Sequence, residues 1–119
     1  MPGMTDEDER IAARLREQLA AVANLTEKKM FGGLAFLVGG NMSVGVNKGE
    51  LLVRASPDEF AELCARPGAR PMDFTGRPMK GWVSVSAEGF ETDDQLAAWV
   101  DASLSYVLGL PAKGSGRGR

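Results

Sequence analysis

The sequence predicts a two-layer α+β domain in which helices pack on one face of an antiparallel sheet of about five strands. Two amphipathic helical patterns lie near the ends of the chain, and short apolar segments separated by turn residues lie between them. The connections between these segments are too short for the crossovers that parallel strands require, which predicts an antiparallel sheet. The expected order of elements is α-β-β-β-α-β-β-α.

The first helix is predicted over residues 5–23. Its apolar residues recur at spacings of three or four and therefore share one face: Ile11, Leu15, Leu19 and Val22. Thr5 is the expected N-cap, and four acidic residues follow it in the first turn, where the helix dipole favours negative charge. Dipole complementation on a solvated face explains these acids better than a divalent-metal site does.

Residues 28–38 form an apolar, strand-like segment that is interrupted by a pair of glycines, Gly32 and Gly33. Glycine weakens a regular strand and usually marks a bulge, a bend or a close approach of another group. We therefore expect a structural kink at Gly32 and Gly33, within one long strand or between two short strands in succession. The alternative is a backbone left open for a ligand or partner.

The remaining strands follow from alternation and turn residues. Met42, Val44 and Val46 are expected on one buried face of the next strand, and a further strand covers residues 51–53. A second β pair is predicted over residues 72–74 and 82–87. In that pair, the valines at 83 and 85 would face one side, and Trp82 and Ser84 the other.

Two further helices are predicted from capping boxes. Ser56 and Glu59 are spaced as a capping box before a short helix, with Pro57 at its first position. Thr92 and Gln95 form a second box before the last helix, which is expected to end at the glycine at 109.

The chain offers few groups for catalysis. It contains no histidine and one cysteine, Cys64, so histidine-based triads and ordinary zinc sites are excluded. It also lacks a phosphate-binding loop and a Cys-x-x-Cys motif. We predict no catalytic residue, metal site or cofactor, and we expect Cys64 to fill apolar space. Asp73 is the one carboxylate that no helix start explains, and an edge or solvent-facing position is expected for it.

Basic residues in or near the predicted strands favour a binding surface over chemistry. The candidates are Lys28, Lys29, Arg77 and Lys80, together with Trp82, if these side chains share a sheet face. Arg54 and Arg70 are also basic and lie near strands. Scattered solubilising charges are the alternative. The net charge of −2 and the 7% aromatic content argue against direct nucleic-acid binding.

Several segments resemble, in the same order, the TfoX N-terminal domain family. They are KKMFGGLAF at 28–36, GGNM at 39–42, ELLVR at 50–54, FTGRPMKGW at 74–82, the helix at 96–100 and its exit at 110–113. The resemblance spans about residues 5 to 113. It implies a fold similar to type III secretion chaperones. It also implies regulation, because TfoX, also called Sxy, is a positive regulator of natural competence that assists a cyclic-AMP receptor protein at promoters. TfoX has a C-terminal domain in addition, so its competence role is not transferred whole.

These observations lead to a hypothesis about organisation and function. Residues 5–111 are expected to form one domain, between a flexible N-terminus (1–4) and a disordered basic tail (112–119). One cysteine and the lack of a signal-peptide core indicate the cytoplasm. The leading hypothesis is a bacterial, non-enzymatic interaction module in transcriptional regulation, which binds a protein partner and no membrane. The alternative is a small-molecule-binding domain or a carboxylate-based enzyme with a pocket around Asp73 or Arg77. The oligomeric state is left open, a homodimer included.

Overall fold

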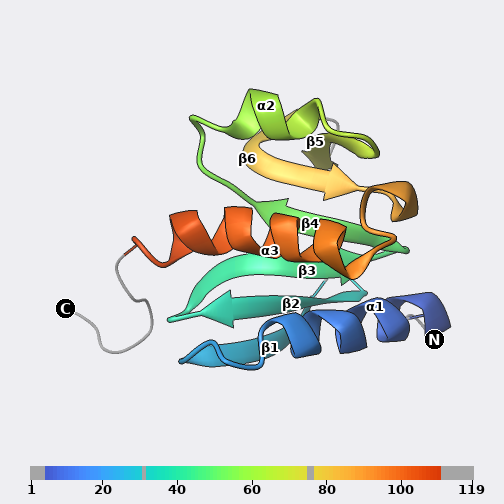
Figure 1. Ribbon diagram of the computed structural model, residues 1–119, viewed down its shortest axis with the longest axis vertical. Helices are drawn as coiled ribbons and strands as arrows, with labels where there is room; N and C mark the ends of the chain where they lie inside the picture. Colours follow the sequence, from blue (N-terminus) through green and yellow to red (C-terminus); the bar gives the residue numbers. More distant parts are fainter. Residues whose placement is uncertain (1–4, 31, 75–76, 111–119) are drawn as a thin grey trace.

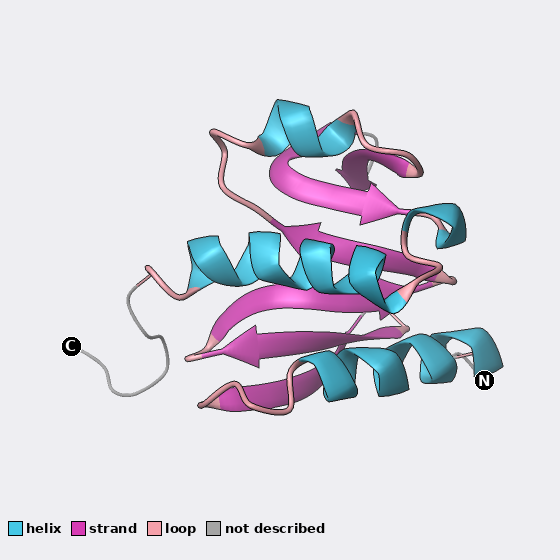
Figure 2. Cartoon of the chain, in the orientation of Figure 1, coloured by secondary structure: helices cyan, strands magenta, loops and turns pink. Residues whose placement is uncertain are grey.

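The computed structural model describes residues 5–30, 32–74 and 77–110, and it shows a six-stranded antiparallel sheet with helices on one face (Figures 1 and 2). The elements are α1 (Asp6–Gln18), β1 (Leu25–Met30), β2 (Gly33–Val38), β3 (Asn41–Asn47), β4 (Glu50–Arg54), α2 (Phe60–Cys64), β5 (Ala69–Phe74), β6 (Arg77–Val85), a 3-10 turn η1 (Ala87–Gly89) and α3 (Asp93–Val107). The predicted α+β class is confirmed. The predicted flexible terminus (1–4) and tail (112–119) lie outside the described residues.

The strands lie in the order β1-β2-β3-β4-β6-β5, so β1 and β5 form the two edges of the sheet. Every neighbouring pair is antiparallel, as expected. In the described part of the chain, no helix has the length and apolar character needed to cross a bilayer.

The sheet has six strands rather than about five because the kinked segment is a hairpin. Met30 of β1 pairs with Gly33 of β2, so the chain reverses direction between these two antiparallel strands. Of the two interpretations of the glycine pair, two short strands in succession is therefore correct. Gly32 has a φ of 78°, in the left-handed region. Gly33 is needed for space, since a β-carbon there would overlap the carbonyl oxygen of Val46 on β3.

The core lies between the sheet and the three helices (Figure 1). The sheet contributes Leu34, Phe36, Val44, Val46, Leu51, Val53, Val83 and Val85, and the helices contribute Ile11, Leu15, Leu63, Leu96, Trp99 and Val100. Burying one large apolar side chain of this kind contributes about 1.5–3 kcal/mol. The predicted inner faces of the first helix and of residues 82–87 are thus confirmed.

In β3 the predicted alternation is wrong at one position. The pairing of β2 with β3 shifts between Phe36 and Leu37, and Ser43 is the extra residue of the resulting irregularity. Ser43, rather than Met42, therefore lies beneath α3. The Ser103 hydroxyl on α3 donates to the carbonyl oxygen of Ser43 over 2.9 Å, and the two hydroxyl oxygens lie 2.7 Å apart. Both serines are fully buried, so these hydrogen bonds satisfy polar groups inside the core.

The first helix is shorter than predicted, and its acidic first turn has a second use. Thr5 caps α1 as expected, because its hydroxyl accepts a hydrogen bond from the Asp8 amide over 3.1 Å. Asp8 is only 1% exposed, so the description of these acids as a solvated face is wrong for this residue. Its carboxylate accepts a 2.7 Å hydrogen bond from the Gly49 amide. Asp8 therefore ties the start of α1 to the turn between β3 and β4.

The two predicted capping boxes have different outcomes. At α3 both hydrogen bonds of the Thr92 and Gln95 box are present. At α2 the predicted box is wrong, because the helix begins only after Glu59, which makes no side-chain cap. The Ser56 hydroxyl instead accepts from the Asp58 amide, and this local turn occupies the first residues of the predicted helix.

The two neighbouring glycines should respond differently to substitution. Gly33→Ala is expected to lower the free energy of unfolding by about 1–3 kcal/mol, because its β-carbon would meet strand β3. Gly32→Asn should cost less than about 1 kcal/mol, since asparagine tolerates the left-handed region and the space around Gly32 is open. Urea denaturation of both variants measures the difference, and equal costs would contradict this explanation.

The buried serine pair should matter for stability. Ser103→Ala is expected to cost about 1–2 kcal/mol of unfolding free energy, because it leaves the Ser43 hydroxyl without its partner on α3. Ser105→Ala on the exposed side of α3 is the matched control and should change stability by less than about 0.5 kcal/mol. Thermal or urea unfolding of the two variants tests this expectation.

Candidate interaction surface

One face of the sheet has no described helix on it. All three α-helices pack on the face that carries the core valines and leucines (Figures 1 and 2). Since side chains alternate along each strand, the intervening residues point to the opposite side. We call this side the bare face. It is the part of the fold in which side chains of all six strands come together without being used for the core.

Residues of all six strands form one continuous line across the bare face. Strand pairing places them side by side in the order Lys28, Ala35, Gly45, Leu52, Ser84 and Arg70, which we call the central row. Lys28 and Arg70 are exposed and stand at the two edges. Ala35 and Ser84 are 1% and 4% exposed, and Leu52 is half-buried. The row is thus small and apolar in the middle and cationic at both ends.

Larger apolar side chains border the central row on one side. Leu37 pairs with Met42, and Arg54 pairs with Trp82, one step along the strands from the row. Leu37, Met42 and Trp82 are all half-buried. The Arg54 guanidinium lies 5.9 Å from the ring centre of Trp82 and 5.7 Å from that of Tyr106 on α3. Contacts of this kind hold an arginine in place by cation–π attraction.

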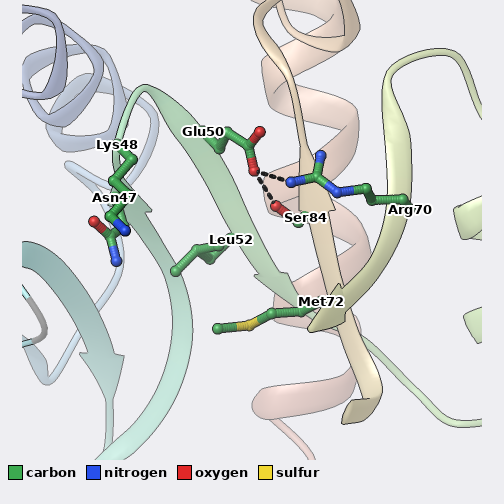
Figure 3. Close-up of a pocket in the computed structure, with 7 residues that line it drawn as sticks. All are labelled: Asn47, Lys48, Glu50, Leu52, Arg70, Met72 and Ser84. Carbon is green, nitrogen blue, oxygen red and sulfur yellow. Dashed lines mark hydrogen bonds and ion pairs between the residues drawn. The ribbon is translucent and has the colours of Figure 1, made fainter. Parts of the chain in front are cut away.

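On its other side the row opens into a hollow of about 400 Å³. It is lined by Asn47, Lys48, Glu50, Leu52, Arg70, Met72 and Ser84 (Figure 3). The Glu50 carboxylate accepts a 2.6 Å hydrogen bond from the Arg70 guanidinium and a 2.5 Å hydrogen bond from the Ser84 hydroxyl. Both bonds go to the same carboxylate oxygen, as Figure 3 shows. This contact joins β4, β6 and β5 across the hollow.

Two opposing effects set the pKa of Glu50. Burial of the carboxylate is the largest and raises its pKa. The hydrogen bonds from Arg70 and Ser84 and the positive charge of Arg70 lower the pKa and together outweigh burial. The net pKa lies below the ordinary glutamate value, so Glu50 stays ionised near neutral pH. Glu50 therefore forms a fixed ion pair in the hollow.

The five residues predicted as a partner surface do not all lie on one face. Lys28 pairs with Ala35 on the bare face, whereas Lys29 pairs with Leu34, which belongs to the core face. Trp82 lies on the bare face, on β6, three intervening strands away from β1. Arg77 and Lys80 also belong to β6, but their side chains lie outside what the structure describes. Their role toward a partner stays a prediction.

Charge is distributed unequally between the two layers. The strands carry six basic residues, Lys28, Lys29, Arg54, Arg70, Arg77 and Lys80, and three acidic ones, Glu27, Glu50 and Asp73. Helices α1 and α3 carry eight acidic residues, five on α1 and three on α3, and three basic ones. The net charge of −2 hides this separation.

The groups that could support chemistry are few among the described residues. No group of three or more histidine, cysteine or carboxylate side chains is placed there to hold a metal ion. Cys64 is half-buried against the core, and burial raises the pKa of its thiol, which reduces the thiolate that nucleophilic chemistry requires. The side chain of Asp73 lies outside what the structure describes.

The sequence alone does not indicate Leu52 as a residue of the bare face, whereas alternation correctly places Ser84 opposite the valines at 83 and 85. Leu52 stands between two core residues in Leu51-Leu52-Val53, so a strand of continuous apolar residues conceals the change of face. Strict alternation along residues 50–54 was the available signal. Arg70 was noticed only as a basic residue near a strand.

The ion pair in the hollow predicts a pH-dependent contribution to stability. A carboxyl group with a lowered folded-state pKa contributes stability above its unfolded pKa, near 4.5, and loses it as the pH falls through the folded pKa. Glu50→Gln should therefore lower the unfolding free energy by about 0.5–1.5 kcal/mol at pH 7, and by less at pH 3, below the unfolded pKa. Urea denaturation at both pH values measures it, with the exposed Glu62→Gln as control. A difference that is the same at both pH values would contradict the assignment.

No curated protein sequence matches the chain, but one model of a protein family does. The family model of the TfoX N-terminal domain matches residues 17–106, which include all six strands and almost all of α3. The match therefore contains the whole bare face and confirms the expected resemblance over most of the 119 residues. The chain belongs to the TfoX N-terminal domain family.

Proposed function

We propose that this domain is a non-enzymatic interaction module of the bacterial cytoplasm, which binds a protein of the transcription machinery through the bare face of its sheet. The observation that carries the proposal is the bare face itself. Its described apolar side chains, Leu37, Met42, Leu52, Met72 and Trp82, are half-buried and have no helix over them. Apolar surface of this kind is typical of places where another protein packs.

The edges of the sheet favour the face over strand addition as the mode of binding. A partner strand added to an edge needs a row of free backbone amides. On β5, Pro71 has no amide hydrogen, and the pairing register shifts between Pro71 and Met72. On β1, Lys28 and Lys29 place two adjacent charges on the edge. Both edges therefore carry features that oppose pairing with another chain.

The contacts of the titratable groups favour binding over catalysis. A general acid or base works best with a pKa near the operating pH. The pKa of Glu50 is lowered by its ion pair with Arg70, and burial raises the pKa of Cys64. Both shifts move these groups away from the values that catalysis near neutral pH would need. The regulatory part of the proposal is supported by family membership, because the resemblance to TfoX implies a regulator that acts with a transcription factor at promoters.

A matched pair of variants tests the proposal. Leu52→Glu on the bare face should abolish capture of the partner from a lysate of the native cell, because a charge replaces apolar contact area. Leu108→Glu changes an apolar side chain that is 63% exposed beyond α3, away from the bare face, and should leave capture unchanged. Quantitative mass spectrometry of the captured proteins is the measurement, and thermal unfolding checks that both variants fold.

The proposal predicts that the protein lost with Leu52→Glu is a transcription factor or a polymerase subunit. Equal capture by wild type and Leu52→Glu would show that the bare face is not the binding surface. Specific loss of an unrelated enzyme or a transport protein would contradict the regulatory part alone.

A further inference from the structure

We infer that the partner presents an apolar segment with one acidic residue at each end, and that this segment lies along the central row with its acids at Lys28 and Arg70. The inference rests on the proposed function and names the chemistry of the partner. The observation that carries it is the arrangement of the row, in which cationic side chains stand at both ends of a line of small and apolar residues.

The length of the row defines the segment. Lys28 and Arg70 lie on the two edge strands, five strand spacings apart. At about 4.8 Å for each spacing, the two cations are separated by about 24 Å. In an extended chain, two residues eight positions apart are separated by about 26 Å, and the even spacing directs their side chains to the same side. Acidic residues at positions i and i+8 of an extended segment therefore match the two ends.

Apolar contact in the middle of the row comes from Leu52 and its neighbour Met72. Ala35 and Gly45 are directly paired, have little or no side chain and are themselves buried, so they form the floor of the row. Leu52 is paired with Gly45 and supplies apolar contact area. Met72 lies beside it in the hollow, with its side chain directed toward Leu52 (Figure 3). An apolar segment packed here would remove these side chains from water.

Both ends of the row have hydrogen-bonding capacity for a carboxylate. In the described part of the chain, Lys28 forms no ion pair. Arg70 donates to Glu50 from one terminal nitrogen, and a guanidinium has five N–H donors in all. Lys48 lines the same hollow as Arg70 and adds a second positive charge at that end. Each end can thus pair with an acidic side chain.

The separation of charge between the two layers favours binding of an acidic segment to the sheet rather than to the helices. The acidic α1 and α3 repel an acidic segment, while the strands attract it. A nucleic acid fits the same surface less well. Its phosphates form a dense line of charge, whereas the ends of the row are separated by four residues without charge.

The test uses a defined peptide and the full chain. The probe is an eleven-residue peptide with glutamate at positions 2 and 10 and leucine, alanine and serine between them, and a second peptide has lysine at both positions. Titration into isotope-labelled protein is followed by amide chemical shifts. The glutamate peptide should shift the amides of residues 28, 35, 45, 52, 70 and 84, and the lysine peptide should not.

Charge reversal at neighbouring lysines provides the matched control. Lys28→Glu should weaken binding of the glutamate peptide roughly fivefold or more, because like charges then meet at that end of the row. Lys29→Glu changes the adjacent residue, which lies on the core face, and should leave affinity within about twofold. The lysine peptide should bind Lys28→Glu more tightly than it binds wild type. The amide spectrum shows whether each variant is folded, and Lys28→Gln serves as the milder substitution.

Several outcomes would overturn the inference. Equal effects of Lys28→Glu and Lys29→Glu, or shifts outside the row, would show that the segment does not bind along the central row. A short DNA duplex that shifts the same amides with higher affinity would replace it by nucleic acid. Concentration-dependent shifts of the protein alone, abolished by Lys28→Glu, would show that a second copy occupies the row. If Leu52→Glu abolishes partner capture while Lys28→Glu does not, the proposed function stands and the acidic segment is wrong.

Discussion

The register of the antiparallel sheet is the constraint on which both layers of this domain depend. Pairing aligns Phe36, Val44, Val53 and Val83 in one line across four strands beneath the helices. The same register aligns the central row on the opposite side, one position away along each strand. A slip of one residue in any pair would move core valines to the bare face. The apolar core and the candidate surface are therefore two consequences of one set of pairings.

Two buried polar contacts attach the helices to this sheet at β3. Asp8 joins the start of α1 to the turn that follows β3, and Ser103 joins the middle of α3 to Ser43 within β3. Both contacts replace water with a specific partner inside the protein, so they favour one position of each helix over others of similar apolar burial. The helices consequently stay on the core face, and the opposite face remains available for a partner.

Local features of the fold could be predicted from sequence, and features that depend on pairing could not. Thr5 and Thr92 were correctly identified as caps, because a cap is defined by residues within one helical turn. The hairpin at Gly32 and the irregularity at Ser43 depend on which residue of the neighbouring strand lies opposite. The candidate surface depends even less on local sequence. Lys28 and Arg70 are 42 positions apart, and only the register of five strand pairs places them on one row.

Two roles are proposed for Lys28, protection of the sheet edge and recognition of an acidic partner, and Lys29 shares only the first. A charge on an edge strand opposes pairing with another chain whichever its sign, and both Lys28 and Lys29 provide one. An acidic partner, by contrast, responds to the sign of the charge and to the face on which it stands, and only Lys28 stands on the bare face. Replacing Lys28 with glutamate keeps a charge on the edge strand and reverses the sign of the charge at that end of the row. Loss of binding in that variant would therefore reflect recognition at the face, since protection of the edge is retained.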